Sequence, residues 1–234
     1  MKQHMNNNQL HPIIGSGFIA KKFKKSLNYL RKNNVVVYAS GISNSLEKNK
    51  KNLNKEIKKF LKFYKKNNKR VIYISTYSIC DGSRFKSKYV KNKIKIEKII
   101  KKKVANYLII RLPEIVGNNK NPNTLSNFFY NKVYKSKKFV LYQNVKRNIL
   151  DIDDAIKSCL KLIKLRNRKN EIVNLLSNKF HTPSQIVNIF EKILYKKAYF
   201  EIKKIKKAKW YLKNNFYVKT NNSYLFKTLK KYYS

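Results

Sequence analysis

Apolar and polar positions form blocks of two alternating kinds along the first half of the chain. Three short runs rich in β-branched residues, at 35–40, 71–76 and 107–112, are apolar at nearly every position, which is typical of strands buried on both faces. Between these runs, apolar residues recur at helical spacing, with lysines on the opposite side. The first helix carries Leu46, Leu53, Ile57, Phe60, Leu61 and Tyr64, and the second carries Val90, Ile94, Glu97 and Ile100. This alternation predicts a parallel sheet covered by helices.

The second half of the chain is less regular. Its patterns predict helices near 123–135, 151–165 and 183–195, and short strands near 139–142, 147–150, 171–175 and 198–202. Thr182 and Pro183 provide a helix start, as an N-cap followed by a proline in the first turn. Residues 206–234 are basic and aromatic without clear periodicity, and they receive no assignment.

The formal net charge is +45, from 56 Lys and Arg against 11 Asp and Glu, which by itself suggests a nucleic acid or an anionic membrane as partner. However, only seven of the 56 are arginine, and the lysines are spread through every segment instead of forming one stripe. Lys, Asn, Ile, Tyr and Phe share A/T-rich codons. Coding bias with solvated lysine faces therefore explains the charge better than specific nucleic-acid binding does.

Cysteine and histidine content limits other classes of site. Cys80 and Cys159 provide no disulfide framework, which favours a reducing compartment. The three histidines show no metal-ligand spacing, so no metal site is expected. No apolar segment reaches the length of a membrane span, and no signal peptide is visible. We expect a soluble, cytoplasmic protein.

The five glycines all follow the carboxyl ends of predicted strands, which is the edge where open parallel sheets bind ligands. For Gly41, Gly82 and Gly117, a simple role in ending the strand explains the position about as well as ligand binding does. It does not explain the pair Gly15 and Gly17, which leads directly into a helix.

Gly15, Gly17 and Ala20 fit the G-x-G-x-x-G/A pattern, in which backbone N–H groups and a helix N-terminus approach a pyrophosphate. Two features depart from the usual context. Pro12 lies where a central strand would need an N–H donor, and no acidic residue for a ribose hydroxyl occurs at 32–36.

Tyr89 and Lys93 lie four residues apart on a predicted helix, so they share one face. A lysine ammonium beside a tyrosine stabilises the phenolate, and such a tyrosine can be a general acid or base between an alcohol and a ketone. Thr76, at the end of the neighbouring strand, could hold the same substrate oxygen. The Y-x-x-x-K spacing alone carries no weight, because about three or four matches are expected by chance. The four in this chain are Tyr89/Lys93, Tyr134/Lys138, Tyr142/Lys146 and Tyr199/Lys203.

Six segments, taken in order, resemble the extended short-chain dehydrogenases/reductases of the NAD-dependent epimerase/dehydratase family, which act on nucleotide sugars. The segments are "IIGSGFIA", "VVVYASG", "VIYISTYSICDG", "YVKNK", "LIIRLPEIVG" and "RNILDIDDAI". The resemblance spans roughly residues 10–200. It implies an α/β fold with a shortened, Rossmann-like, doubly wound parallel sheet and a small C-terminal α/β substrate-binding portion. The implied divisions are a dinucleotide-binding domain at 10–120, a substrate-binding portion at 121–205 and a tail at 206–234.

The resemblance also implies roles for individual residues. Thr76, Tyr89 and Lys93 would be catalytic, and Lys93 would also bind the nicotinamide ribose. Asn123 and Arg147 would contact the substrate, although Arg147 could equally be a surface ion-pair partner. The residues expected to bind NAD or NADP are Gly15, Ser16, Gly17, Phe18, Ile19, Ala20, Ala39, Ser40, Gly41 and Lys93. Read from the residues alone, Asp151, Asp153 and Asp154 are more readily explained as helix-capping carboxylates.

Two departures from the family pattern affect the interpretation. The two strands and helix that usually follow the first helix are missing, which predicts a smaller sheet with a reduced adenosine site. Tyr77 and Ser78 occupy the places of an acidic pair found in the dehydratase branch, which favours the epimerase and reductase branches.

We therefore predict an NAD(P)-dependent epimerase or reductase of a nucleotide-linked sugar, serving surface polysaccharide synthesis, and leave a homodimer open. The alternatives are a family member that binds a nucleotide sugar or a protein partner without turnover and, ranked last, a nucleic-acid binder.

Overall fold

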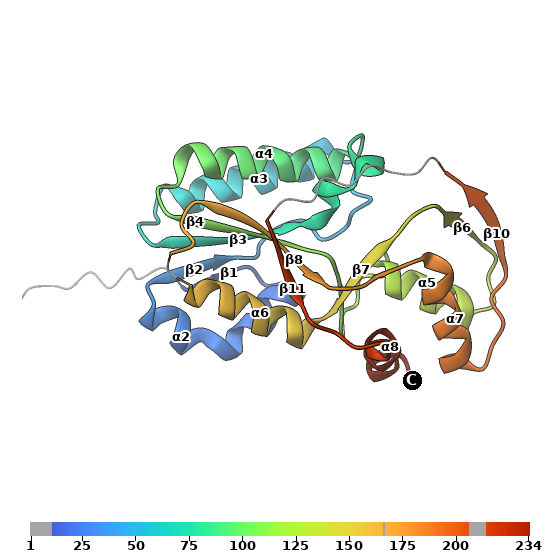
Figure 1. The fold of residues 1–234 in the computed structure, drawn as a ribbon. Coiled ribbons are helices and arrows are strands. Elements are labelled where there is room, and N and C mark those ends of the chain that lie inside the picture. Colours follow the sequence, from blue (N-terminus) through green and yellow to red (C-terminus); the bar gives the residue numbers. More distant parts are fainter. Residues whose placement is uncertain (1–10, 166, 206–213) are drawn as a thin grey trace, which may run out of the picture.

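A six-stranded parallel sheet forms the centre of the molecule (Figure 1). The computed structural model describes residues 11–165, 167–205 and 214–234. The strand order in the sheet is β1-β2-β3-β4-β8-β11, and every neighbouring pair is parallel. The predicted parallel α/β sheet is confirmed. Its strands are β1 (Ile13–Ile14), β2 (Val35–Tyr38), β3 (Arg70–Thr76), β4 (Tyr107–Leu112), β8 (Glu171–Ser177) and β11 (Asn215–Val218).

Helices cover both faces of this sheet, as Figure 1 shows. On one face, α3 (Lys50–Tyr64) and α4 (Lys88–Lys103) pack through Phe60, Ile96 and Ile100. On the other face lie α1 (Phe18–Phe23), α2 (Leu27–Lys32) and α6 (Ile152–Lys164), with a 3-10 turn at Lys24–Ser26 between α1 and α2. The strands are apolar at nearly every position because both of their faces are buried.

β1 is the edge strand, and no described strand lies beyond it. The Val37 amide donates to the Pro12 carbonyl at 2.8 Å, and the Ala39 amide donates to the Ile14 carbonyl at 2.8 Å. Proline has no backbone N–H to donate. An edge strand has no second neighbour that would need that donor, so Pro12 is compatible with this position. The smaller sheet expected from the short spacing between the first helix and the second strand is therefore observed.

A second group of elements packs beside the carboxyl end of the sheet (Figure 1). β5 (Glu114–Val116), β7 (Arg147–Asp151) and β9 (Phe180–His181) form a three-stranded sheet, and β6 (Phe139–Gln143) pairs with β10 (Phe200–Lys204). The helices are α5 (Leu125–Tyr134), α7 (Pro183–Leu194) and α8 (Tyr224–Tyr233), and 3-10 turns occur at Tyr77–Cys80 and Gly82–Arg84.

The helix start predicted at Thr182 is confirmed. Its side chain accepts from the Gln185 amide at 3.2 Å, and the Gln185 side chain accepts from the Thr182 amide at 2.8 Å, which makes a capping box. β11 and α8 lie in the segment that the sequence left unassigned; residues 206–213 of that segment are outside the described residues.

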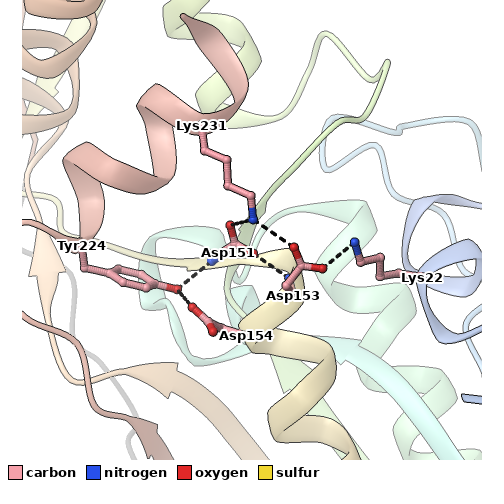
Figure 2. A network of polar contacts seen from close by, with 6 residues as sticks. All are labelled: Lys22, Asp151, Asp153, Asp154, Tyr224 and Lys231. Carbon is pink, nitrogen blue, oxygen red and sulfur yellow. Dashed lines mark hydrogen bonds and ion pairs between the residues drawn. The ribbon is translucent and has the colours of Figure 1, made fainter. Parts of the chain in front are cut away.

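A network of polar contacts ties α8 to the start of α6. Figure 2 shows its six residues, Lys22, Asp151, Asp153, Asp154, Tyr224 and Lys231. The Tyr224 hydroxyl accepts from the Asp151 amide at 2.9 Å and donates to Asp154 at 2.8 Å. Lys231 donates to Asp151 at 3.0 Å and to Asp153 at 2.9 Å, and Asp153 also pairs with Lys22 of α1. The predicted capping role is confirmed for Asp151, whose side chain accepts from the Asp153 amide at 2.6 Å.

Candidate active site

The turn after β1 requires glycine at its first position. Gly15 has φ of +136°, and a Cβ built there would lie 2.5 Å from the Ala39 carbonyl oxygen. A side chain at this point would push β1 away from the end of β2. Gly17, the N-cap of α1, has ordinary extended dihedrals, and a Cβ there would meet nothing within 4 Å. The two glycines therefore have different roles. Gly15 allows its backbone to approach that of Ala39, whereas the absence of a side chain at Gly17 leaves open space at the start of α1.

A cavity of about 1260 Å³ lies at the carboxyl edge of the main sheet. Its lining comes from both parts of the fold and includes most of the residues selected from the sequence. Those residues are Ser16, Gly17, Phe18, Ile19, Ala39, Ser40, Gly41, Thr76, Tyr89, Lys93, Asn123 and Arg147. Two are not in the lining: Gly15 lies against the backbone of Ala39, and Ala20 is fully buried in the apolar core.

Tyr89 and Lys93 occupy successive turns of α4 on the side facing the sheet. Tyr89 is 8% exposed and Lys93 3% exposed, and the Lys93 Nζ lies 5.5 Å from the centre of the Tyr89 ring. Thr76 ends β3, where its Oγ1 accepts from the Ser78 amide at 3.2 Å. This leaves the Thr76 hydroxyl proton available for a ligand in the cavity.

Lys93 also has a partner that the sequence analysis did not select. Its Nζ lies 2.6 Å from Oε1 of Glu56 on α3, and both side chains are almost completely buried. The signal in the sequence was present, because Glu56 interrupts the apolar side of a lysine-rich helix. The structure buries it in one stripe with Leu53, Phe60 and Phe63. A carboxylate at such a position needs a cationic or hydrogen-bonding partner.

A second buried carboxylate holds α4 against the sheet. Glu97, one turn beyond Lys93, accepts from the Arg111 guanidinium at 3.0 and 2.6 Å and from the Ser75 hydroxyl at 2.6 Å. Ser75 precedes Thr76 on β3, and Arg111 is on β4. This contact fixes the rotation of α4 relative to the strand end that carries Thr76.

Arg147 enters the cavity from the start of β7, and its Nη1 lies 3.2 Å from Oδ2 of Asp81. Burial and the neighbouring Arg84 lower the pKa of Arg147, and Asp81 opposes that shift. Burial also raises the pKa of Glu114, despite amide donors and the two arginines nearby. The arginine is thus a largely buried ion-pair partner that faces the cavity, and not a surface one. Asn123, by contrast, is exposed on the rim.

Other kinds of site are not evident in the part of the chain that the structure describes. It contains no group of three or more His, Cys, Asp or Glu side chains arranged for a metal ion. None of its helices has the length and apolar character needed to cross a membrane.

Searches with models of protein families and among curated proteins give no match for this chain. Solved structures do match. RMD from Pseudomonas aeruginosa, solved with NADPH, has a TM-score of 0.65 at 11% identity, covering 93% of this chain and 96% of that one. UDP-N-acetylglucosamine 4-epimerase from Bacillus cereus has a TM-score of 0.65 at 17% identity, covering 94% and 93%. UDP-glucose 4-epimerase from Thermotoga maritima, solved with UDP-glucose, has a TM-score of 0.61 at 13% identity, covering 92% and 81%.

At these identities the similarity establishes the fold of the chain. The Rossmann-type architecture expected from the six sequence segments is confirmed.

Proposed function

We propose that this chain is an NAD(P)-dependent epimerase or reductase of a nucleotide-linked sugar that serves the synthesis of a surface polysaccharide. The observation that carries the proposal is that Thr76, Tyr89 and Lys93 line one cavity together with Ser16 and Gly17 of the glycine turn. The glycine turn lies far along the sequence from Thr76, Tyr89 and Lys93, and the fold brings both sets of residues to the carboxyl edge of the sheet, where parallel sheets bind ligands.

The residues present fit the diphosphate side of a dinucleotide. Gly15 allows the backbone to close against β2, and the empty space at Gly17 leaves room for phosphate oxygens near the amides that begin α1. The loop Ala39–Gly41 would line the path towards the nicotinamide. On the side expected to hold the adenosine, β1 is the edge strand of the sheet among the described residues. No carboxylate occurs at 32–36. The ribose carboxylate that favours NAD over NADP is therefore missing.

Each side chain has a defined part in the proposed reaction. A bound nicotinamide would accept hydride from the sugar carbon or return it. Tyr89 would remove or return the proton of the sugar hydroxyl, and Thr76 would hold the same oxygen by donating a hydrogen bond. The Lys93 ammonium would stabilise the Tyr89 phenolate. Arg147 would bind the diphosphate of the substrate, and Asn123 would contact the substrate at the rim.

The same observations support one other candidate, a protein that binds a nucleotide sugar or a protein partner without redox turnover. Two features favour it: β1 is the last described strand at its edge of the sheet, and no carboxylate for a ribose hydroxyl occurs at 32–36. Turnover distinguishes the two candidates.

The test follows the absorbance of reduced cofactor across a panel of nucleotide sugars, with epimer products separated by chromatography. We expect wild-type turnover with at least one sugar and a loss of 100-fold or more in Tyr89→Phe, in line with the usual contribution of a general acid–base group. Tyr199→Phe is the matched control, because Tyr199 also precedes a lysine by four residues but is exposed beside β10. Full turnover in Tyr89→Phe would remove the proposed mechanism.

A further inference from the structure

Glu56 and Lys93 form a buried ion pair between α3 and α4. The Lys93 Nζ lies 2.6 Å from Glu56 Oε1. The Lys93 side chain is 4% exposed and the Glu56 side chain is 2% exposed. The second carboxylate oxygen, Oε2, accepts from Asn92 Nδ2 at 2.9 Å. Both oxygens are therefore held by neighbouring residues of α4, which fixes the carboxylate in one orientation.

Gly41 makes room for this pair. A Cβ at Gly41 would lie 2.3 Å from the Lys93 Nζ and 2.9 Å from Glu56 Oε1. The backbone of Gly41 does not require a glycine for its conformation, so the requirement is one of space. The loop after β2 thus closes directly over the ammonium and the carboxylate.

The groups around Lys93 decide whether it is charged. They are Glu56 from α3, Tyr38 from β2, Tyr73 from β3 and Tyr89 from α4 itself. Burial lowers the pKa of Lys93, but Tyr73, Tyr89 and Glu56 more than offset this and raise it overall. Burial raises the pKa of both Tyr38 and Tyr73, so both are neutral phenols at neutral pH. Of these four groups, Glu56 is the carboxylate that contacts the Lys93 ammonium directly, at 2.6 Å.

We propose that Glu56 is a positioning residue that keeps the Lys93 side chain charged and holds it beside the Tyr89 ring. The inference rests on the proposed function, in which the ammonium stabilises a phenolate. A neutral amine at the same place would give no such stabilisation. Burial on this scale disfavours an isolated ammonium, so the charge of Lys93 depends on its carboxylate partner.

The test is Glu56→Gln, read by NMR of lysine side-chain carbons and nitrogens against pH, with the Lys93 signal assigned by its loss in Lys93→Arg. We expect the Lys93 pKa in the wild type to lie above the usual lysine value. In Glu56→Gln, where burial is no longer opposed by a carboxylate, the titration midpoint should fall by roughly two pH units or more. Glu201→Gln is the control, because Glu201 is exposed and pairs with the exposed Lys138.

Gly41→Ala is the second variant, which keeps every charge and drives the ammonium off the carboxylate by steric contact. We expect the Lys93 midpoint to fall there too, by a smaller amount. This variant keeps the proposal testable if Glu56→Gln does not fold. An unchanged Lys93 titration in the variant that folds would overturn the proposal, because a purely structural Glu56 would lower the melting temperature without moving the titration.

This NMR measurement needs neither cofactor nor substrate, so it is independent of the Tyr89→Phe test of the proposed function. Where turnover is observed, a kinetic signature should accompany it. The kcat of Glu56→Gln should fall as pH rises through the new Lys93 midpoint and recover at lower pH, whereas wild-type kcat shows no such loss. A Glu56→Gln profile parallel to that of the wild type would also overturn the proposal.

Discussion

Replacing Gly15 by alanine should destabilise the protein even without a ligand. The new Cβ would lie 2.5 Å from the Ala39 carbonyl oxygen and 2.8 Å from its carbonyl carbon, at a φ of +136°. A non-glycine residue in such a conformation costs about 1–3 kcal/mol, and the backbone contact must be relieved by moving β1. We expect a total of about 3 kcal/mol, or a fall in Tm of roughly 6–12 °C for a chain of this size.

Gly17→Ala is the matched control, because its Cβ would meet nothing within 4 Å. The loss of a favourable N-cap and the gain from a stiffer unfolded chain oppose each other, so stability should change by less than about 1 kcal/mol. Thermal unfolding followed by circular dichroism compares the two variants with the wild type. A Gly15→Ala protein that melts within 2 °C of the wild type would refute the close approach of β1 and β2.

Three further predictions concern the contacts around the cavity and α8. Glu97→Gln leaves a buried guanidinium without its charge partner and should lower the urea-unfolding free energy by about 3 kcal/mol, whereas exposed Glu201→Gln should leave it unchanged within error. Hydrogen bonds from Lys22 and Lys231 lower the pKa of Asp153, so its contribution is complete above the unfolded carboxyl pKa of about 3.9 and is lost as pH falls below it. Because Asp153 is half exposed, Asp153→Asn should lower stability by only about 0.5 kcal/mol at pH 6 and by nothing measurable near pH 2, with Tm against pH as the readout. NAD and NADP should bind with affinities within about tenfold of each other, because no carboxylate follows the glycine turn at the ribose position; a preference above 100-fold in calorimetry would contradict this.

The middle of the central sheet could be predicted from the sequence because β2, β3 and β4 are apolar at nearly every position. Their burial on both faces imposes the pattern, and the lysine-rich helices between them alternate clearly between apolar and charged sides. The place of β8 and β11 could not be predicted in the same way. β11 has four residues and pairs with β8 far from it in sequence, and a short strand stabilised by such a distant partner leaves little periodicity.

The residues of the candidate site also differ in how far the sequence indicated them. Gly15, Tyr89 and Lys93 were selected because order and spacing along the chain indicate them. Glu56 was overlooked because its partner Lys93 lies on a neighbouring helix, and only the fold brings the two side chains together. The Asp81 partner of Arg147 was overlooked for the same reason, since the two residues meet only through the fold.

Calorimetric titration with NAD and NADP tests the central claim most directly, which is that a dinucleotide binds over the Gly15–Gly17 turn beside Tyr89. We predict saturable binding of at least one of them with a Kd below about 1 mM. Gly17→Ala should weaken this affinity by about tenfold or more, because its methyl group would occupy the open space proposed for the phosphate oxygens. Wild-type protein that gives no saturable heat with either cofactor at millimolar concentration would contradict the account.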